Sequence, residues 1–193
     1  MHDHAAQAEK REMRKRLAAR AAALSSQYRT EADESIRALL LHSAVYRRAS
    51  SLFVYISMEG EPSTRGIMES AWAAGKRVYV PKCHGKGQMD AVRITGWDAL
   101  SPGCLGIPEP RDGEALGPGE GAALCLIPCV SAARDGTRLG HGAGYYDRWL
   151  AAHGGKTVCL CYEEMLSPRI PAASWDIKMD AVLTEKGFYP TVI

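Results

Sequence analysis

The chain has 193 residues, of which 46% are hydrophobic and 24% are charged, and its formal net charge is only +2. These proportions are close to the globular average, so they exclude an intrinsically disordered protein. The length suits one compact domain over residues 1–193. The slight net charge gives no reason to expect nucleic acid or a membrane surface as a partner.

The N-terminal segment MHDHAAQAEK lacks the apolar core of a signal peptide, and no apolar stretch is long enough to span a membrane. We therefore expect a cytoplasmic protein. Its six cysteines form no C-x-x-C pair and no zinc-finger spacing, so we interpret them as buried small hydrophobes, with disulfide or metal ligation as the alternative. They are Cys83, Cys104, Cys125, Cys129, Cys159 and Cys161.

The first quarter of the chain is predicted to be helical. Residues 5–24 are rich in Ala, Lys, Arg and Glu, which favour helix. A second helix is predicted over residues 31–48, where apolar residues recur at helical spacing. Thr30 and Asp33 resemble a capping pair at its start.

The rest of the chain alternates between predicted strands and helices. Helices are predicted over residues 63–74, ending at Gly75, and over residues 145–152, while residues 102–121 are rich in Gly and Pro and predict a long surface loop. The alternation predicts an α/β fold with a mostly parallel central sheet and helices on both faces. Such sheets bind ligands beyond the carboxyl ends of their strands. The predicted strands are residues 51–57, 77–81, 89–94, 123–127, 157–162 and 181–184.

The most informative stretch is RLGHGAGYYDR, residues 138–148, which precedes and opens a predicted helix. Gly140, Gly142 and Gly144 alternate there, so the backbone can take positive φ and approach a ligand closely. A glycine-rich loop before a helix presents free N–H groups, which suits phosphate. The spacing fits neither the Walker A loop nor the dinucleotide pattern G-x-G-x-x-G. The alternative is a flexible surface turn.

Charged residues near this loop favour a metal–nucleotide site. Arg138 stands before the glycines and can bind phosphate oxygens through two N–H groups. Asp147 lies in the first turn of the following helix, where a carboxylate can hold Mg²⁺ or simply favour the helix N-terminus. Lys10 and Arg14 lie four residues apart on one face of the first helix and can clamp phosphate; a solvated basic helix is the alternative.

The segment ISMEGEPST, residues 56–64, follows the first predicted strand, where a doubly wound sheet places ligand contacts. Glu61 can accept paired hydrogen bonds from a planar heterocycle that carries an amino group and a ring N–H. Met58 offers an apolar wall for such a ring. The alternative for Glu61 is an exposed loop charge.

Together these segments resemble the 5-formyltetrahydrofolate cyclo-ligase family. RLGHGAGYYDR matches the family's RLGxGxGYYD loop, and SMEGEPST matches its SMxxExxT segment. GIPEP (residues 106–110), MDAVRI (residues 89–94) and the KxxxR of the first helix fit as well. The resemblance covers residues 10 to about 184.

This resemblance implies ATP- and Mg²⁺-dependent closure of 5-formyltetrahydrofolate to 5,10-methenyltetrahydrofolate, with release of ADP and phosphate, through a phosphorylated N5-iminium intermediate. It implies catalytic roles for Arg138 and Tyr146 and a Mg²⁺ site at Asp147 and Asp176. The implied folate contacts are Ile56, Met58, Glu61 and Tyr145. The implied ATP contacts are Lys10, Arg14, Arg138, Gly140, His141, Gly142, Ala143, Gly144, Tyr145 and Tyr146.

We further expect a monomer whose partners are these small molecules, without nucleic acid or membrane. One competing hypothesis is a non-catalytic nucleotide- or RNA-binding relative that uses the basic first helix; it predicts a concentrated basic face. It also predicts that loss of Asp147 or Glu61 is tolerated. Another is a metal enzyme built on Cys159 and Cys161, which would need His ligands that the neighbouring sequence lacks.

Overall fold

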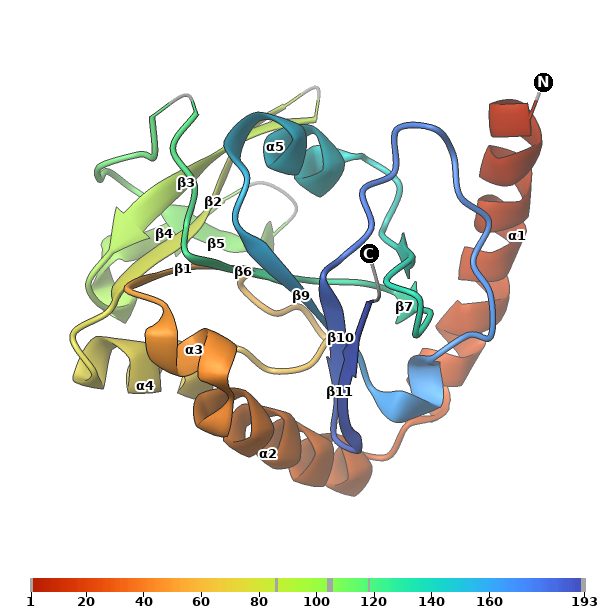
Figure 1. The fold of residues 1–193 in the computed structure, drawn as a ribbon, viewed down its shortest axis with the longest axis horizontal. Helices are drawn as coiled ribbons and strands as arrows, with labels where there is room; N and C mark the ends of the chain where they lie inside the picture. Colours follow the sequence, from red (N-terminus) through yellow and green to blue (C-terminus); the bar gives the residue numbers. More distant parts are fainter. Residues whose placement is uncertain (1, 86, 104–105, 118, 192–193) are drawn as a thin grey trace.

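A computed structural model of the chain describes residues 2–85, 87–103, 106–117 and 119–191. Seven strands form the central sheet: β1 Ser51–Val54, β2 Arg77–Gly85, β3 Gln88–Ile94, β6 Leu124–Ile127, β9 Lys156–Leu160, β10 Ala181–Thr184 and β11 Gly187–Pro190. Their order is β11-β10-β9-β6-β1-β2-β3 (Figure 1). The strands from β10 to β2 are parallel, and β3 and β11 are antiparallel edges.

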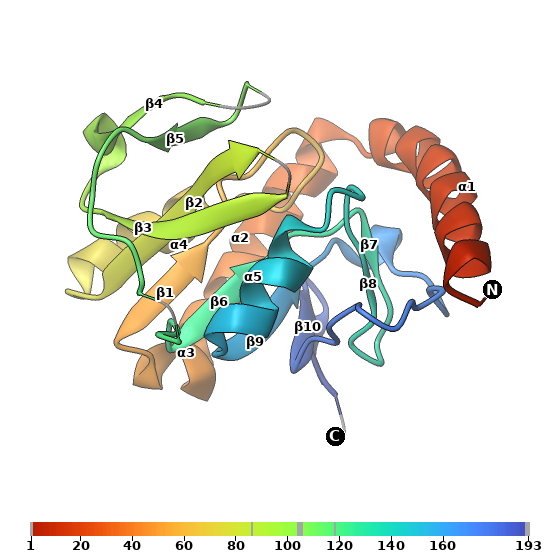
Figure 2. The same cartoon turned by 90° about the horizontal axis from the view of Figure 1, so that it is seen from above.

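Helices cover both faces of this sheet, as predicted. The bounds are α1 His2–Ala23, α2 Ser26–His42, α3 Ala44–Arg48, α4 Arg65–Ala73 and α5 Tyr145–His153. Helices α2, α3 and α4 lie on one face and α5 lies on the other (Figure 1). Helix α1 stands apart, beside the small hairpin of β7 Ser131–Ala132 and β8 Arg138–Leu139 (Figure 2). The predicted α/β fold with a mostly parallel sheet is confirmed.

The central strands supply a large part of the core. Every residue of β1, β6 and β10 is buried, which is the pattern of strands covered on both faces. Four of the cysteines are buried and free, which agrees with their interpretation as small hydrophobes; they are Cys125, Cys129, Cys159 and Cys161. Cys83 is half-buried, and Cys104 lies outside the described residues. No helix among the described residues is long and apolar enough to cross a membrane.

The helix predicted over residues 31–48 is two helices, and the predicted capping pair is wrong. Ser25 caps α2 by accepting a hydrogen bond from the backbone N–H of Tyr28 at 3.1 Å. Ser43 separates α2 from α3 and caps α3 by accepting from the N–H of Tyr46 at 3.2 Å. Serine hydroxyls compete with the backbone for such donors, so a serine can start or interrupt a helix that the apolar spacing alone would continue.

Several very short strands were also missed. The segment predicted as a loop over residues 102–121 contains β5 Pro108–Pro110, which pairs with β4 Leu100–Pro102. The hairpin of β7 and β8 and the edge strand β11 were not predicted. Strands of two to four residues are too short to show a periodic pattern, so pairing rather than local sequence defines them.

Asp33 links helix α2 to two loops through hydrogen bonds. Its Oδ1 accepts hydrogen bonds from the Ser63 N–H at 2.9 Å and from the Tyr162 hydroxyl at 2.8 Å. Burial raises the pKa of Asp33 above its usual value of 3.8, against the opposing effect of these two hydrogen bonds. A raised pKa in the folded state means that the contribution of this group to stability is full below pH 3.8 and is lost as the pH rises through the folded-state pKa.

We expect Asp33→Asn, which keeps an acceptor oxygen without the charge, to unfold at an equal or higher urea concentration than the wild type at pH 7. The advantage should shrink toward pH 4. Asp33→Ala should cost about 1–3 kcal/mol at both pH values, because the Ser63 and Tyr162 donors lose their partner. Urea denaturation at the two pH values measures this, and equal losses for Asn and Ala at pH 7 would contradict it.

Candidate active site

A cavity of about 370 Å³ opens where the chain leaves the carboxyl ends of β1 and β6. Strand β1 continues through α4 to β2 on one side of the sheet, whereas β6 leads to β9 and β10 on the other. Neighbouring strands with connections in opposite directions form the crevice in which α/β sheets bind ligands. The cavity lies at this switch point, beyond the carboxyl ends of the strands as predicted, and its size suits a small molecule.

Every residue predicted for the site lines this one cavity. Helix α1, the segment after β1, the loop between β8 and α5, and the irregular segment before β10 all contribute. The residues are Lys10, Arg14, Ile56, Met58, Glu61, Arg138, Gly140, His141, Gly142, Ala143, Gly144, Tyr145, Tyr146, Asp147 and Asp176. The structure therefore brings the predicted phosphate, folate and metal residues together.

The loop over residues 140–144 leads directly into helix α5. Gly142 and Gly144 adopt φ values of +106° and +70°, as predicted, whereas Gly140 does not take a positive φ. Gly144 occupies the N-cap position and offers no side chain to the first N–H groups of α5. Uncapped N–H groups at a helix start, together with the helix dipole, favour an anion there.

Arginine side chains pack closely against this loop. The guanidinium of Arg14 donates from Nε to the carbonyl of Gly140 at 2.7 Å. A Cβ at Gly142 would lie 3.3 Å from Cζ of Arg14, and a Cβ at Gly144 would lie 3.0 Å from Nη1 of Arg148. The lack of side chains at these glycines thus gives positive charge close access to the backbone.

Arg148 is a supporting residue that sequence reasoning missed. It donates from Nη2 to the carbonyl of Ala143 and from Nε to the carbonyl of Gly87 at 2.9 Å. It therefore ties the glycine loop to the turn between β2 and β3. Its place as the last residue of the RLGHGAGYYDR motif was the only signal in the sequence.

Arg138 is a buried cation with unused donors. Only 8% of the residue is exposed, and its Nη2 lies 3.0 Å from Oδ2 of Asp147. That contact is off the direction of a hydrogen bond, and neither Nε nor Nη2 has a hydrogen-bond partner among the described residues. Burying donors without acceptors is costly, so the guanidinium is suited to an anionic ligand in the cavity.

Lys10 is also buried, at 3% exposed, and forms an ion pair with Asp176. Asp176 accepts a further hydrogen bond from the N–H of Ala173 at 2.6 Å. Arg11 and Lys15, on the same helix, are exposed. The interpretation of a solvated helix face therefore holds for those neighbours but is wrong for Lys10, which is directed into the cavity wall.

The two carboxylates predicted to bind Mg²⁺ are each paired with a cation, Asp147 with Arg138 and Asp176 with Lys10. Among the described residues, no group of three or more His, Cys, Asp or Glu side chains is arranged to hold a metal ion. Two carboxylates nevertheless fit Mg²⁺ that arrives with a nucleotide, because this ion completes its octahedral shell with phosphate oxygens and water.

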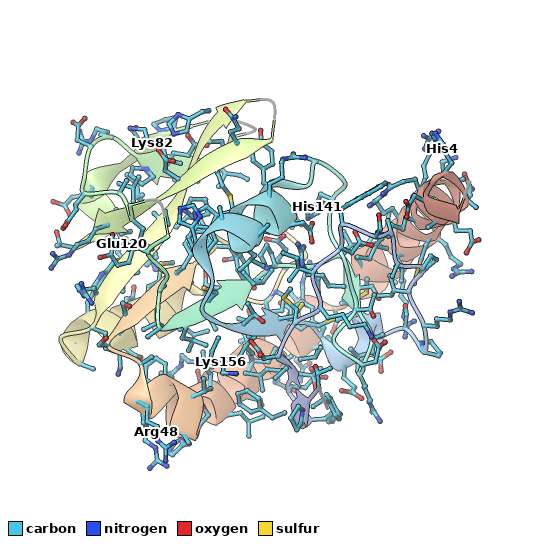
Figure 3. The ribbon with its side chains drawn as sticks, turned by 45° about the horizontal axis from the view of Figure 1, so that its top comes forward. His4, Arg48, Lys82, Glu120, His141 and Lys156 are labelled. Atoms are coloured by element: carbon cyan, nitrogen blue, oxygen red, sulfur yellow. The ribbon has the colours of Figure 1, made fainter. Side chains whose placement is uncertain are left out.

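The part of the cavity lined by Ile56 and Met58 is apolar and contains one buried carboxylate. Glu61 is 8% exposed, so its interpretation as an exposed loop charge is wrong. Its Oε2 accepts from the N–H of Met58 at 2.9 Å, and its Oε1 lies 3.1 Å from Nε2 of His141. Figure 3 shows His141 between helix α5 and helix α1.

Several lining residues of this end were not predicted. They come from β2, which pairs with β1, and from β3, β5 and the segment before β5; strands β3 and β5 pack against β2. In a parallel sheet the carboxyl end of β2 lies beside that of β1, so the predicted order of strands could have indicated that residues of β2 line the cavity. The residues are Pro81, Cys83, Met89, Ile107 and Glu109.

Tyr146 lies near both Glu61 and Arg138. Burial raises the pKa of the Tyr146 phenol far above its usual value of 10.0, and the charge of Glu61 raises it further. The phenol is therefore neutral at physiological pH and can donate a hydrogen bond but cannot serve as a base. Its ring centre lies 5.8 Å from Cζ of Arg138, within the range of a cation–π contact.

A mostly parallel sheet whose switch point holds buried cations, a glycine loop and an apolar cavity is typical of α/β enzymes with a small-molecule site. Comparison with known proteins gives the family. The 5-formyltetrahydrofolate cyclo-ligase family matches residues 6–185, and the chain belongs to this family of ligases.

Relatives match over most of their length. The chain is 32% identical over 190 residues to the 5-formyltetrahydrofolate cyclo-ligase of Mus musculus, covering 91% of this chain and 93% of the relative. It is 32% identical over 142 residues to that of Escherichia coli K12, covering 70% and 78%. The 5,10-methenyltetrahydrofolate synthetase of Aquifex aeolicus has a similar structure, with a TM-score of 0.83, 28% identity and coverage of 94% and 92%.

Proposed function

We propose that this protein closes 5-formyltetrahydrofolate to 5,10-methenyltetrahydrofolate while ATP is converted to ADP and phosphate in the presence of Mg²⁺. The observation that carries the proposal is the composition of one cavity. A glycine loop with buried cations forms one part of its lining, and apolar side chains around buried Glu61 form another. A triphosphate fits the first and a pterin ring fits the second.

At the phosphate end, the nucleotide would exchange the partners of existing ion pairs. Its phosphate oxygens would bind the N–H groups that begin α5 and the cations of Lys10, Arg14 and Arg138. Asp147 and Asp176 would then be released to hold Mg²⁺, which neutralises phosphate charge when it is bound. The unused donors of Arg138 support this exchange.

At the pterin end, Glu61 would accept hydrogen bonds from the exocyclic amino group and a ring N–H. One of its oxygens is already fixed by the Met58 N–H, so the carboxylate is held in position. His141 would yield its place on the other oxygen. Ile56, Met58 and Tyr145 would enclose the ring on its apolar faces.

The reaction must activate an amide-like formyl group. Resonance stabilises such a group and raises the barrier to rotation about its C–N bond to about 18–20 kcal/mol. The formyl oxygen would attack the γ-phosphate of ATP to give an N5-iminium phosphate. N10 would then attack the activated carbon, and phosphate would leave as the five-membered ring closes. Positioning and charge neutralisation dominate phosphoryl transfer, and Arg138 with the neutral donor Tyr146 can supply both.

The direct test follows the absorbance of the methenyl product after the protein is mixed with 5-formyltetrahydrofolate, Mg²⁺ and ATP. We expect product only when ATP and Mg²⁺ are both present, with one ADP formed for each product molecule. Product formation that is unaffected by omission of ATP, or the absence of any product, would contradict the proposal.

We expect Glu61→Gln to weaken folate binding by about 10- to 100-fold, which corresponds to loss of one or two hydrogen bonds to a charged group. The new amide donor would also face the donors of the pterin. ATP binding, at the other end of the cavity, should change little. Separate calorimetric titrations of the two ligands measure this, with the exposed neighbour Glu59→Gln as the control. Equal losses for both ligands would count against this role of Glu61.

A further inference from the structure

Glu109 lines the cavity but has no part in the function proposed above. The residue lies in β5 and is half-buried. Among the described residues it has no hydrogen-bond or ion-pair partner. A free carboxylate in a ligand cavity is unusual because partial burial of an unpaired charge is unfavourable.

The other three carboxylates of the cavity are all engaged. Asp147 lies against Arg138 and Asp176 against Lys10. Glu61 accepts from a backbone N–H and contacts His141. Each is therefore committed to a cation or a donor, and Glu109 alone of the four is free to accept a proton.

The backbone and stem of Glu109 are held in place although its carboxylate is free. Strand β5 pairs with β4 in a register that sets Glu109 opposite Ser101. Pro108 and Pro110 flank it and restrict the backbone on both sides. A Cβ at Gly103 would lie 2.4 Å from Cγ and 2.6 Å from Cδ of Glu109, so the whole side chain up to its carboxyl carbon lies over a residue without a side chain.

The surroundings of Glu109 place it at the folate end. Ile107, Met89 and Cys83 line the same cavity, and β5 packs against β2 and β3. Lys82 of β2 is directed elsewhere, because its Nζ donates to the carbonyl of Arg111 at 2.7 Å (Figure 3 labels Lys82). No cation therefore neutralises the Glu109 carboxylate among the described residues.

We propose that Glu109 is the general base of ring closure, accepting the proton that N10 loses. This inference rests on the proposed function. N10 enters the second half of the reaction as a secondary amine; its lone pair forms the new C–N bond, and the C–O bond to phosphate breaks. N10 must also release its proton, and transfer to the Glu109 carboxylate completes the balance without a change of oxidation state. Positioned bases of this kind contribute about 10²- to 10⁴-fold.

The other titratable groups of the cavity are less suited to this step. Tyr146 is a neutral donor because its pKa is raised by burial. His141 is exposed and contacts Glu61. Cys83 is half-buried, and a thiol is a weak acceptor in its protonated form.

The experiment separates the two halves of the reaction in a single turnover. Wild-type protein and Glu109→Gln are mixed with Mg²⁺, ATP and 5-formyltetrahydrofolate; ADP is measured after rapid quenching and the methenyl product by absorbance. For Glu109→Gln we expect ADP at nearly the wild-type rate and methenyl product slowed about 10²-fold. Preserved ADP formation also shows that the variant is folded and binds both substrates.

Two further variants sharpen the result. Glu109→Asp keeps a carboxylate, and Gly103→Ala keeps Glu109 but displaces its stem, so both should slow product formation less than Glu109→Gln while leaving ADP formation intact. Glu59→Gln, an exposed loop glutamate outside the cavity, should match the wild type. Product formation by Glu109→Gln at the wild-type rate, or an equal loss of ADP and product, would overturn the role of Glu109 as the base. The proposed function would be unaffected by that result. A wild type that forms no ADP would overturn the proposed function and this inference with it.

Discussion

Asp147→Ala is expected to lower kcat on the order of 10²-fold or more, as loss of a group that organises transition-state charge often does. Asp147 lies at the start of α5, 3.0 Å from the guanidinium of Arg138, and its other oxygen accepts from the Ile177 N–H at 3.3 Å. Removing it would take away one of two proposed Mg²⁺ ligands beside the phosphates. Steady-state rates at saturating substrates, measured over a range of Mg²⁺ concentrations, test this.

The Mg²⁺ dependence distinguishes metal binding from a purely structural effect. Asp147→Asn keeps the shape of the side chain, and it should need more Mg²⁺ for half-maximal activity than the wild type. Asp135→Ala removes a surface ion pair with Lys178 outside the cavity and serves as the control. Wild-type turnover by Asp147→Ala at saturating Mg²⁺ and ATP would reject Asp147 as a metal ligand.

Arg138→Met should have an effect of at least similar size, about 10²- to 10³-fold in kcat, because Arg138 offers buried, preorganised donors where phosphate charge develops. Arg138→Lys should not restore the rate, since an ammonium group lacks the planar pair of donors that fits phosphate. Folate binding should be nearly unchanged in both variants. Turnover measurements, together with separate titrations of ATP and folate, would show this pattern.

Arg138→Met also leaves the Asp147 carboxylate without its cation, so a loss of stability accompanies the loss of activity. The double variant Arg138→Met with Asp147→Asn removes both charges and should recover much of the melting temperature. It should remain inactive. Recovery of activity along with stability would mean that Arg138 acts only through the fold.

The order of strands and helices follows from the sequence because buried parallel strands are nearly continuous apolar runs, as at Leu124–Ile127. The division of the predicted second helix into α2 and α3 could not be predicted from the sequence, because the hydroxyl of one residue, Ser43, determines it. Pairing likewise defines the short strands β4, β5, β7 and β8. Local pattern carries little information about contacts of that kind.

The residues of the site likewise fall into those that a sequence motif predicts and those that only tertiary packing brings together. The site residues predicted from helix α1, from the segment after β1, from the glycine motif and at Asp176 all line one cavity. The ion pair between Lys10 and Asp176 joins residues 166 positions apart, and no local pattern indicates it. The residues missed at the folate end, such as Met89 and Glu109, are brought there by the packing of β3 and β5 rather than by any motif.

The most direct measurement is a crystal structure with 5-formyltetrahydrofolate and a non-hydrolysable ATP analogue bound together. We expect the terminal phosphate within hydrogen-bonding distance of Arg138 and of the N–H groups that begin α5, with the pterin held by Glu61 and the formyl oxygen facing that phosphate. Both ligands bound away from the segment 140–144, with this segment facing bulk solvent, would contradict the account.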